Sequence, residues 1–286
     1  MLCTLFSRPF DRAGWIFEIK WDGYRAIAEI EKGSVRLYSR KLKSLEGYFP
    51  QLVEVLSELD TQAVIDGEVV VLDEEERSHF ELLRHRTRRE KDYLVYYVFD
   101  LLYLDGRDLR RLPLLRRKEN LKELIENSSV PSIQFSDHVE EKGKAFFEVA
   151  SKRGLEGIVG KDAASPYISG ARTDYWVKFK NYRVEQVYIG GFTGSLNHIE
   201  SLVLGIFKDK DFICVGHTDK GLNNGGTRQQ LRRDLPNLIR PSSPFKNKPD
   251  VTAPIHWVEP KITCRMRFLE WTQDGLRRHS TVVGLG

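Results

Sequence analysis

Residues 18–30 read EIKWDGYRAIAEI and combine a strand pattern with a lysine in an unusual place. Alternate side chains of an extended run point to opposite faces, so Lys20 shares a face with Glu18. Asp22-Gly23 then breaks the run, and a second strand follows. A lysine at a strand end is ordinarily a surface residue whose aliphatic stem packs while its ammonium group stays in water. The rest of the chain decides whether Lys20 is such a residue or a reactive one.

Strand and helix patterns alternate around this stretch as far as Asn181. Strands are predicted at 14–20, 24–39, 63–73, 93–104, 157–161 and 174–180, the second run turning back at 31–33, and helices at 48–59, 114–127 and 141–154. After Asn181, short strands alternate with Gly and Asn turns, with one helix near 227–235. That pattern of short strands and turns is typical of a small oligonucleotide-binding (OB) β-barrel. We therefore predict an α+β fold, with antiparallel sheets and flanking helices in residues 1–182 and an OB-fold domain in residues 183–286.

Composition describes a soluble globular protein, with 41% apolar and 30% charged residues. Cys3, Cys214 and Cys264 are far apart and lack metal-ligand spacing, which argues against a structural disulfide or a zinc site. No segment has the apolar length of a signal peptide or a membrane span. We expect a cytoplasmic protein with no membrane partner.

Cations are concentrated in three short windows, at 84–91, 109–118 and 228–235, although the formal net charge is only +4. Such windows suit a polyanionic partner. They also suit solvated helix faces in a protein with almost as many acids. Both interpretations stay open at this level.

The spacing of Lys20, Asp22, Gly23 and Arg25 forms the pattern K-x-D-G-x-R. A free lysine has a pKa of about 10.4 and is almost entirely protonated at neutral pH. Cationic neighbours or desolvation are needed to make its amine nucleophilic. The pattern therefore raises the hypothesis that Lys20 is a nucleophile whose neutral form is favoured by nearby cations.

Two carboxylates and two lysines are further candidates. Glu68 follows Asp66-Gly67, which we expect to form a turn, and Glu156 precedes Gly157. Carboxylates that lead into apolar strands can hold a divalent cation or a sugar hydroxyl. Lys178 and Lys180 are two residues apart in a strand, so both point to one face and suit phosphate oxygens. Lysines that protect an exposed edge strand from aggregation would give the same spacing.

Six short segments occur in one order along the chain: KWDGYR at 20–25, SR at 39–40, DGE at 66–68, FDLLYLDG at 99–106, EGIVGK at 156–161 and WVKFK at 176–180. Their order and spacing resemble those of the covalent nucleotidyltransferases. More closely, GWIFEIKWDGYRA, VFDLLYLDG, YIGGFTG and VEPKI followed by RFLEWTQDGLRRH resemble the ligase domain of bacterial ligase D, the ATP-dependent DNA ligase of non-homologous end joining. The resemblance implies an adenylation domain in residues 1–182, followed by the OB-fold domain.

The resemblance also implies roles for the matching residues. Lys20 would attack the α-phosphate of ATP and carry AMP covalently. Lys178 and Lys180 would neutralise that phosphate and stabilise charge in the transition state. Glu68 would bind a ribose hydroxyl or a metal-bound water, and Glu156 would help to hold Mg²⁺ or Mn²⁺.

Further roles concern the nucleoside and the DNA end. Glu18 would lie beside the adenine, and Phe99 would stack on it opposite Val159. An aromatic residue in a sequence such as YYVFDLLYL is more often core than nucleotide platform, so the stacking role rests on the resemblance. Arg25 and Arg40 would contact the ribose and the phosphate at the nick.

The family's substrate is nicked or broken double-stranded DNA, sealed through lysyl-AMP and adenylated DNA. The resemblance implies a monomer in DNA repair and recombination, associated with the nucleoid, with a Ku-like end-binding protein and separate polymerase and nuclease chains as partners. Because K-x-D-G is widely shared, an RNA ligase or a capping guanylyltransferase is an alternative. A non-catalytic DNA end-binding relative is another.

Two segments depart from the family pattern. The family's last motif ends in a basic R-x-D-K, whereas here Arg278 matches its first basic position and the chain runs to STVVGLG. We expect this motif to be truncated, and sealing of pre-adenylated DNA to survive better than reaction with ATP. Relatives often have S-R-N-G where this chain has SRKLK at 39–43, so we also expect the glycine turn beside Arg40 to be lost.

Overall fold

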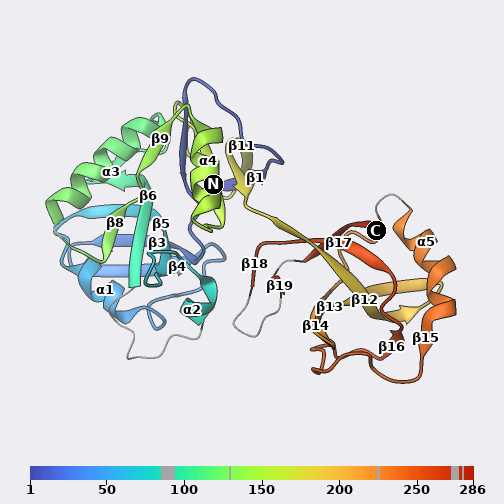
Figure 1. Ribbon diagram of the computed structural model, residues 1–286. Coiled ribbons are helices and arrows are strands. Elements are labelled where there is room, and N and C mark those ends of the chain that lie inside the picture. The colour runs from blue at the N-terminus through green and yellow to red at the C-terminus, as the bar shows by residue number, and fades with distance from the viewer. Residues whose placement is uncertain (85–93, 129, 224–225, 272–276, 279) are drawn as a thin grey trace. The chain divides into compact units, whose positions relative to one another are not determined.

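The structure, a computed structural model, describes residues 1–84, 94–128, 130–223, 226–271, 277–278 and 280–286 (Figure 1). The chain divides into two compact units, Met1–Asn181 and Tyr182–Gly286. The predicted domain boundary lies within one residue of this division. Each unit has its own hydrophobic core, and the two are described separately below.

The first unit contains two sheets. Sheet A has the strand order β1 (Leu2–Leu5), β11 (Arg172–Lys180), β10 (Gly157–Asp162), β2 (Trp15–Ile19) and β9 (His138–Glu140). Sheet B has the order β4 (Ser34–Ser39), β3 (Tyr24–Glu31), β5 (Gln62–Val71), β6 (Leu94–Leu104) and β7 (Arg107–Asp108), with β8 (Ile133–Phe135) also on β6.

Two strand pairings are parallel, where the sequence predicts antiparallel sheets. β6 pairs with β8 in parallel because α3 (Leu114–Ser128) connects them as a crossover helix. Figure 1 shows α3 lying along these two strands. β1 pairs in parallel with β11, from the other end of the unit.

Sheet A separates its side chains into an apolar face and a polar face. Phe17, Ile158, Val177 and Phe179 are buried on one face, where α4 (Gly143–Lys152) packs against β2 and β10. On the other face Val159 lies directly between Glu18 and Lys178 in the strand register. The alternation of side chains therefore places three of the predicted site residues in one row.

Sheet B likewise has one apolar face and one polar face. Its apolar face packs on α1 (Pro50–Ser57), α2 (Phe80–Arg84) and α3, with Leu52, Leu56, Leu83 and Leu121 in the core. On the opposite face Arg25 of β3 pairs in register with Glu68 of β5, which pairs with Tyr97 of β6.

The prediction of a turn at Asp66-Gly67 is wrong, because β5 runs through both residues. Gly67 lies flat against a neighbouring ring, and a Cβ there would be 2.5 Å from Cε2 of Tyr96. Asp66 points away from the core and pairs with Arg25. Close packing, and not turn geometry, explains the glycine.

The expected loss of the turn beside Arg40 is also wrong. Leu42 donates its backbone N–H to the Ser39 carbonyl at 2.8 Å, and Ser39 donates to Lys43 at 2.9 Å. Leu42 adopts the left-handed conformation, with φ of 58°. A leucine therefore completes a turn that favours glycine, at a cost of about 1–2 kcal/mol.

The second unit is a seven-stranded barrel-like sheet with one helix. Its strands are β12 (Arg183–Ser195), β13 (His198–Lys208), β14 (Asp211–Thr218), β15 (Ile239–Arg240), β16 (Ile255–Val258), β17 (Thr263–Phe268) and β20 (Thr281–Leu285). The long strand β12 pairs with β13, β16 and β17 and so joins the sheet around one core. Leu231 of α5 (Thr227–Asp234) packs into that core. A 3₁₀ turn (Leu235–Leu238) and a small ribbon of β18 (Glu270–Trp271) and β19 (Arg277–Arg278) complete the unit.

Candidate active site

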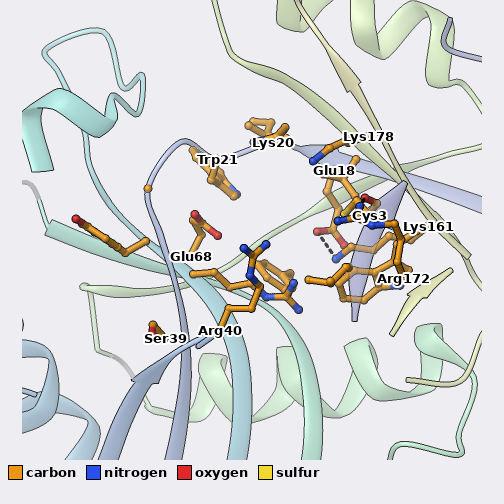
Figure 2. A pocket seen from close by; sticks show the side chains of 18 of the residues that line it. Cys3, Glu18, Lys20, Trp21, Ser39, Arg40, Glu68, Lys161, Arg172 and Lys178 are labelled. Carbon is orange, nitrogen blue, oxygen red and sulfur yellow. Dashed lines mark hydrogen bonds and ion pairs between the residues drawn. The ribbon is translucent and has the colours of Figure 1, made fainter. Parts of the chain in front are cut away.

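A cavity of about 510 Å³ opens between the polar faces of sheets A and B. Glu18, Val159, Lys161, Trp176 and Lys178 line it from sheet A, Arg25, Glu68 and Phe99 line it from sheet B, and Lys20 and Arg40 lie in the loops that follow β2 and β4. Figure 2 shows Glu68 and Arg40 on one side of this space and Lys161 and Lys178 on the other. Eight of the residues predicted from the sequence thus line a single cavity.

Lys20 is held at the edge of sheet A by its backbone and its side chain. Its N–H donates to the carbonyl of Gly157 at 3.0 Å. Its Nζ forms an ion pair with Oε2 of Glu156, and the other oxygen of Glu156 lies 3.5 Å from Nζ of Lys180. Glu156 and Lys180 do not line the cavity themselves. Glu156 pairs with Lys20, which does, and Lys180 pairs with Glu156.

The protonation of Lys20 differs from the sequence-based hypothesis. Burial disfavours its charged form, but Glu156, Glu68 and Asp22 outweigh burial and raise its pKa. The ammonium is therefore the resting form among these protein groups. The expectation that nearby cations favour the neutral amine is wrong for this arrangement, because the carboxylates affect the pKa of Lys20 more strongly than the cations do.

Lys178 and Lys180 form a cationic end of the site. Burial lowers the pKa of Lys178, and the charge of Lys20 lowers it further. Burial likewise lowers the pKa of Lys180, with Glu156 opposing it. Lys20 and Lys180 share the carboxylate of Glu156, and the ammonium of Lys178 adds a third positive charge nearby. This arrangement favours an added anion such as a phosphate.

Glu68 lies across from Arg25 and is half-buried in the cavity wall. Burial raises its pKa to about 8, with Lys20 and Arg25 opposing and Glu156 adding to the rise. At neutral pH this carboxyl therefore holds a proton much of the time. A cation beside Glu68 would favour loss of that proton and gain a carboxylate ligand, and a sugar hydroxyl could hydrogen-bond to either form.

Arg25 forms an ion pair with the buried carboxylate of Asp66. Its guanidinium donates to both oxygens of Asp66, with Nε–Oδ1 at 2.9 Å and Nη2–Oδ2 at 2.5 Å. The hydroxyl of Tyr167 donates to the same carboxylate at 2.8 Å. Arg40, in contrast, is exposed. Both arginines line the cavity, but the Arg25 guanidinium already has an ion-pair partner in Asp66, whereas Arg40 is exposed.

Phe99, Val159 and Trp176 form the apolar end of the cavity. The rings of Phe99 and Trp176 meet edge to face, with centroids 5.9 Å apart. Nζ of Lys161 lies 4.4 Å from the centroid of Phe99 and 4.3 Å from that of Trp176, and it is bonded to Glu18. This end offers flat apolar surface beside a carboxylate, as a nucleobase requires.

Sequence reasoning missed four residues of the site. Lys161 ends the segment EGIVGK and Trp176 begins WVKFK, so the quoted motifs contained them without assigning them a role. Asp66 was interpreted as a turn residue. Lys118 had no signal, because it comes from a charged helix and reaches Glu18 only through the packing of α3.

The structure describes the basic windows of the sequence to different extents. Most of the window at 84–91 lies outside the described residues. In the window at 109–118, Arg117 and Lys118 are buried and pair with Asp100 and Glu18. These two cations stabilise the fold and contact neither solvent nor a polyanion.

Disulfides, clusters of metal ligands and membrane-spanning helices are absent from the described ranges. There, the cysteines form no disulfide, and no group of three or more His, Cys, Asp or Glu residues has the geometry to hold a metal ion. None of the helices described is both long and apolar enough to cross a membrane.

Comparisons with known proteins agree with this geometry. Residues 1–180 match the family model of the ATP dependent DNA ligase domain, and residues 195–285 match the ATP dependent DNA ligase C terminal region. The multifunctional non-homologous end joining protein LigD of Pseudomonas aeruginosa is 33% identical over 99% of this chain, which spans 35% of that protein. The prophage-derived DNA ligase-like protein LigB of Bacillus subtilis is 33% identical over 68% of this chain and 71% of its own length.

Solved structures show the same fold. The ligase domain of LigD from M. tuberculosis is 31% identical, with a TM-score of 0.60 over 100% of this chain and 95% of that one. A mycobacterial DNA ligase D complexed with ATP and MES is 32% identical, with a TM-score of 0.58. The predicted fold class, a nucleotidyltransferase domain followed by an OB-fold domain, is confirmed. The chain belongs to the family of ATP-dependent DNA ligases.

Proposed function

We propose that this chain seals 3′-hydroxyl and 5′-phosphate ends in nicked or broken double-stranded DNA, through AMP carried on Lys20 and then on the DNA. The observation that carries the proposal is the position of Lys20, at a cavity with an apolar end beside Phe99 and a cationic end beside Lys178. A nucleotide bound in that direction would present its α-phosphate to Lys20. The OB-fold unit, residues 183–286, would act with the adenylation unit, residues 1–182.

Self-adenylation requires Lys20 to lose a proton and attack phosphorus. Glu156 accepts a hydrogen bond from the ammonium and is placed to hold that proton. The amine then forms the phosphorus–nitrogen bond as the bond to pyrophosphate breaks. Lys178 and Lys180 would stabilise the charge that develops on the α-phosphate oxygens.

Glu68 and Glu156 would hold Mg²⁺ or Mn²⁺ in this site. Magnesium in phosphoryl-transfer sites takes one or two carboxylates together with substrate phosphates and waters, so two carboxylates are a sufficient protein contribution. Both carboxylates act on Lys20 and raise its pKa, so they lie together at the reacting end of the site. When bound, the ion would neutralise phosphate charge.

Biological context is proposed from the likeness to LigD. The chain spans about a third of the length of those proteins. We propose that a Ku-like protein brings it to DNA ends and that polymerase and nuclease chains act with it there. We propose that it works as a monomer, in the cytoplasm and on the nucleoid. Arg40 is exposed beside the cavity and would contact the phosphate at the break.

Intact mass spectrometry before and after incubation with ATP and Mg²⁺ tests the proposal. We expect the protein and Lys152→Ala, an exposed control on α4, to gain the mass of one AMP, and Lys20→Ala to gain nothing. AMP on Lys20→Ala would contradict the assignment of the nucleophile. GTP labelling in preference to ATP would indicate capping chemistry. Nick binding without any AMP, and without sealing of pre-adenylated nicks, would indicate a non-catalytic end-binding protein.

A further inference from the structure

Glu18 is an almost wholly buried carboxylate at the apolar end of the cavity, with a side chain 2% exposed. Lys118 donates to its Oε1 at 2.7 Å, and Lys161 donates to its Oε2 at 2.8 Å. The hydroxyl of Ser136 donates to Oε2 at 3.3 Å. Figure 2 shows the bond between Glu18 and Lys161 at the cavity wall.

Hydrogen-bond accounting leaves this carboxylate with spare capacity. An ionised carboxylate has about four acceptor positions and no donor. Lys118, Lys161 and Ser136 occupy three of them, two on Oε2 and one on Oε1. The acceptor position that remains is on Oε1, and Glu18 is among the residues that line the cavity. An acceptor of this kind pairs with an amino group and repels a carbonyl oxygen.

Lys118 holds that carboxylate from behind. Its side chain is 1% exposed, comes from α3 and does not line the cavity. Besides Glu18, its ammonium donates to the carbonyl of Ser136 at 2.7 Å and lies 4.4 Å from the ring centroid of Phe135. These partners place the ammonium against Oε1, the oxygen with the spare acceptor position.

We propose that Lys118 is a positioning residue for nucleobase selection, which orients Glu18 and keeps it ionised so that the site accepts a purine with an exocyclic amino group over one with a carbonyl. The inference rests on the proposed function, since it concerns the base of the nucleotide that labels Lys20. Burial alone would favour the neutral carboxyl, and the two lysines reverse that preference and lower the pKa of Glu18. With one lysine removed, the carboxyl would more readily hold a proton and donate it to a carbonyl.

The test compares ATP with inosine triphosphate, which carries a carbonyl in place of the amino group. Lys118→Met keeps the length of the side chain and removes its charge. Lys122→Met, one turn further along α3 and 55% exposed, is the matched control. Initial rates of covalent labelling at varied nucleotide concentration give kcat/KM for each substrate. For Lys118→Met we expect a fall of about tenfold to hundredfold with ATP, mainly through KM, and little change with inosine triphosphate.

A ratio of the two kcat/KM values equal to that of the unsubstituted protein would overturn the inference, because a merely structural loss lowers both values together. If Lys118→Met melts too low to assay, Ser136→Ala replaces it, since it removes one donor to Glu18 with little change in volume. We expect about a threefold fall in the same ratio, as for one weaker hydrogen bond. An unchanged ratio in Ser136→Ala overturns the inference equally. If the unsubstituted protein forms no adduct on Lys20, the proposed function fails and this inference fails with it.

Discussion

Glu18 illustrates how neighbours distant in the chain set the chemistry of one side chain. Its strand neighbours on β2 are apolar, and the sequence gives no partner for its charge. Lys118, Lys161 and Ser136 come from three other segments and keep it ionised in a buried place. Removing one member of such a group leaves buried charges without compensation, which costs more than the net value of the interaction.

The loss of stability caused by Glu18→Gln should therefore depend on pH in a defined direction. Because the folded pKa of Glu18 is lowered, its contribution to stability is present above the unfolded value of about 4.3 and is lost as pH falls through the folded pKa. We expect a loss of about 3–5 kcal/mol in unfolding free energy near neutral pH, shrinking in acid as the unsubstituted protein also becomes neutral at this position.

Urea unfolding of both proteins at neutral pH and below the unfolded pKa measures the difference. His138, in register with Glu18, has a pKa lowered by burial and by Lys118 and titrates in both proteins, so its effect on the difference is secondary. Glu29→Gln, in a surface pair with Arg36, is the control and should cost little at either pH. A loss for Glu18→Gln that is equal at both pH values would contradict the expectation.

At the scale of an element, β5 carries site residues on one face and core residues on the other. Asp66 and Glu68 point to the cavity side, and Gly67 between them lies under the ring of Tyr96. The Tyr96 hydroxyl donates to the carbonyl of Ala26 at 3.0 Å and lies 3.2 Å from that of Ile65. These bonds fix the ring, so the strand cannot accept a larger residue without moving.

Gly67→Ala should destabilise the protein by about 1–3 kcal/mol, because its Cβ would lie 2.5 Å from the Tyr96 ring and 2.6 Å from the Tyr97 carbonyl oxygen. It should also slow labelling of Lys20, because a shift of β5 moves Glu68. Gly47→Ala is the control, since a Cβ there meets nothing within 4 Å. Urea unfolding and adduct formation measure the two effects. Equal stability of the two variants would show that β5 yields to the added methyl group.

At the scale of the molecule, the two units have separate cores. The cavity and its supporting ion pairs lie entirely within Met1–Asn181. The core of Tyr182–Gly286 centres on β12, β13 and β17 with α5. The two units can therefore respond separately to a core substitution.

Leu204→Ala tests this separation, since Leu204 is fully buried in the second core. We expect a loss of about 2–5 kcal/mol confined to the transition of the second unit. In scanning calorimetry, one of two transitions should shift to lower temperature while the other stays in place. A shift of both transitions by the same amount would show that the units unfold together.

Local pattern in the sequence was enough for most of the longer strands and helices of the first unit and for the family. Alternation placed Glu18 on the face of β2 opposite Phe17, although β2 ends at Ile19 and Lys20 lies in the loop that follows. The order of six motifs predicted a ligase fold that the comparisons confirmed. The row of Glu18, Val159 and Lys178 follows from strand periodicity once β2, β10 and β11 are neighbours. These features depend on residues close together in the chain, where spacing carries the information.

Electrostatic partners came from the packing of distant segments. Lys118 comes from α3, which packs on β6 and β8 of sheet B, and still reaches Glu18 of sheet A. Arg25 meets Asp66 because β3 pairs with β5. The pKa of Lys20 rises because Glu156 is its ion-pair partner. Gly67 was misread for the same reason, since the Tyr96 ring that requires it belongs to another strand. Charge interactions depend on distance in space, which sequence separation does not report. The motifs therefore predicted most of the residues that line the cavity. The protonation of Lys20 and Glu18 and the residues that support them depend on the tertiary structure.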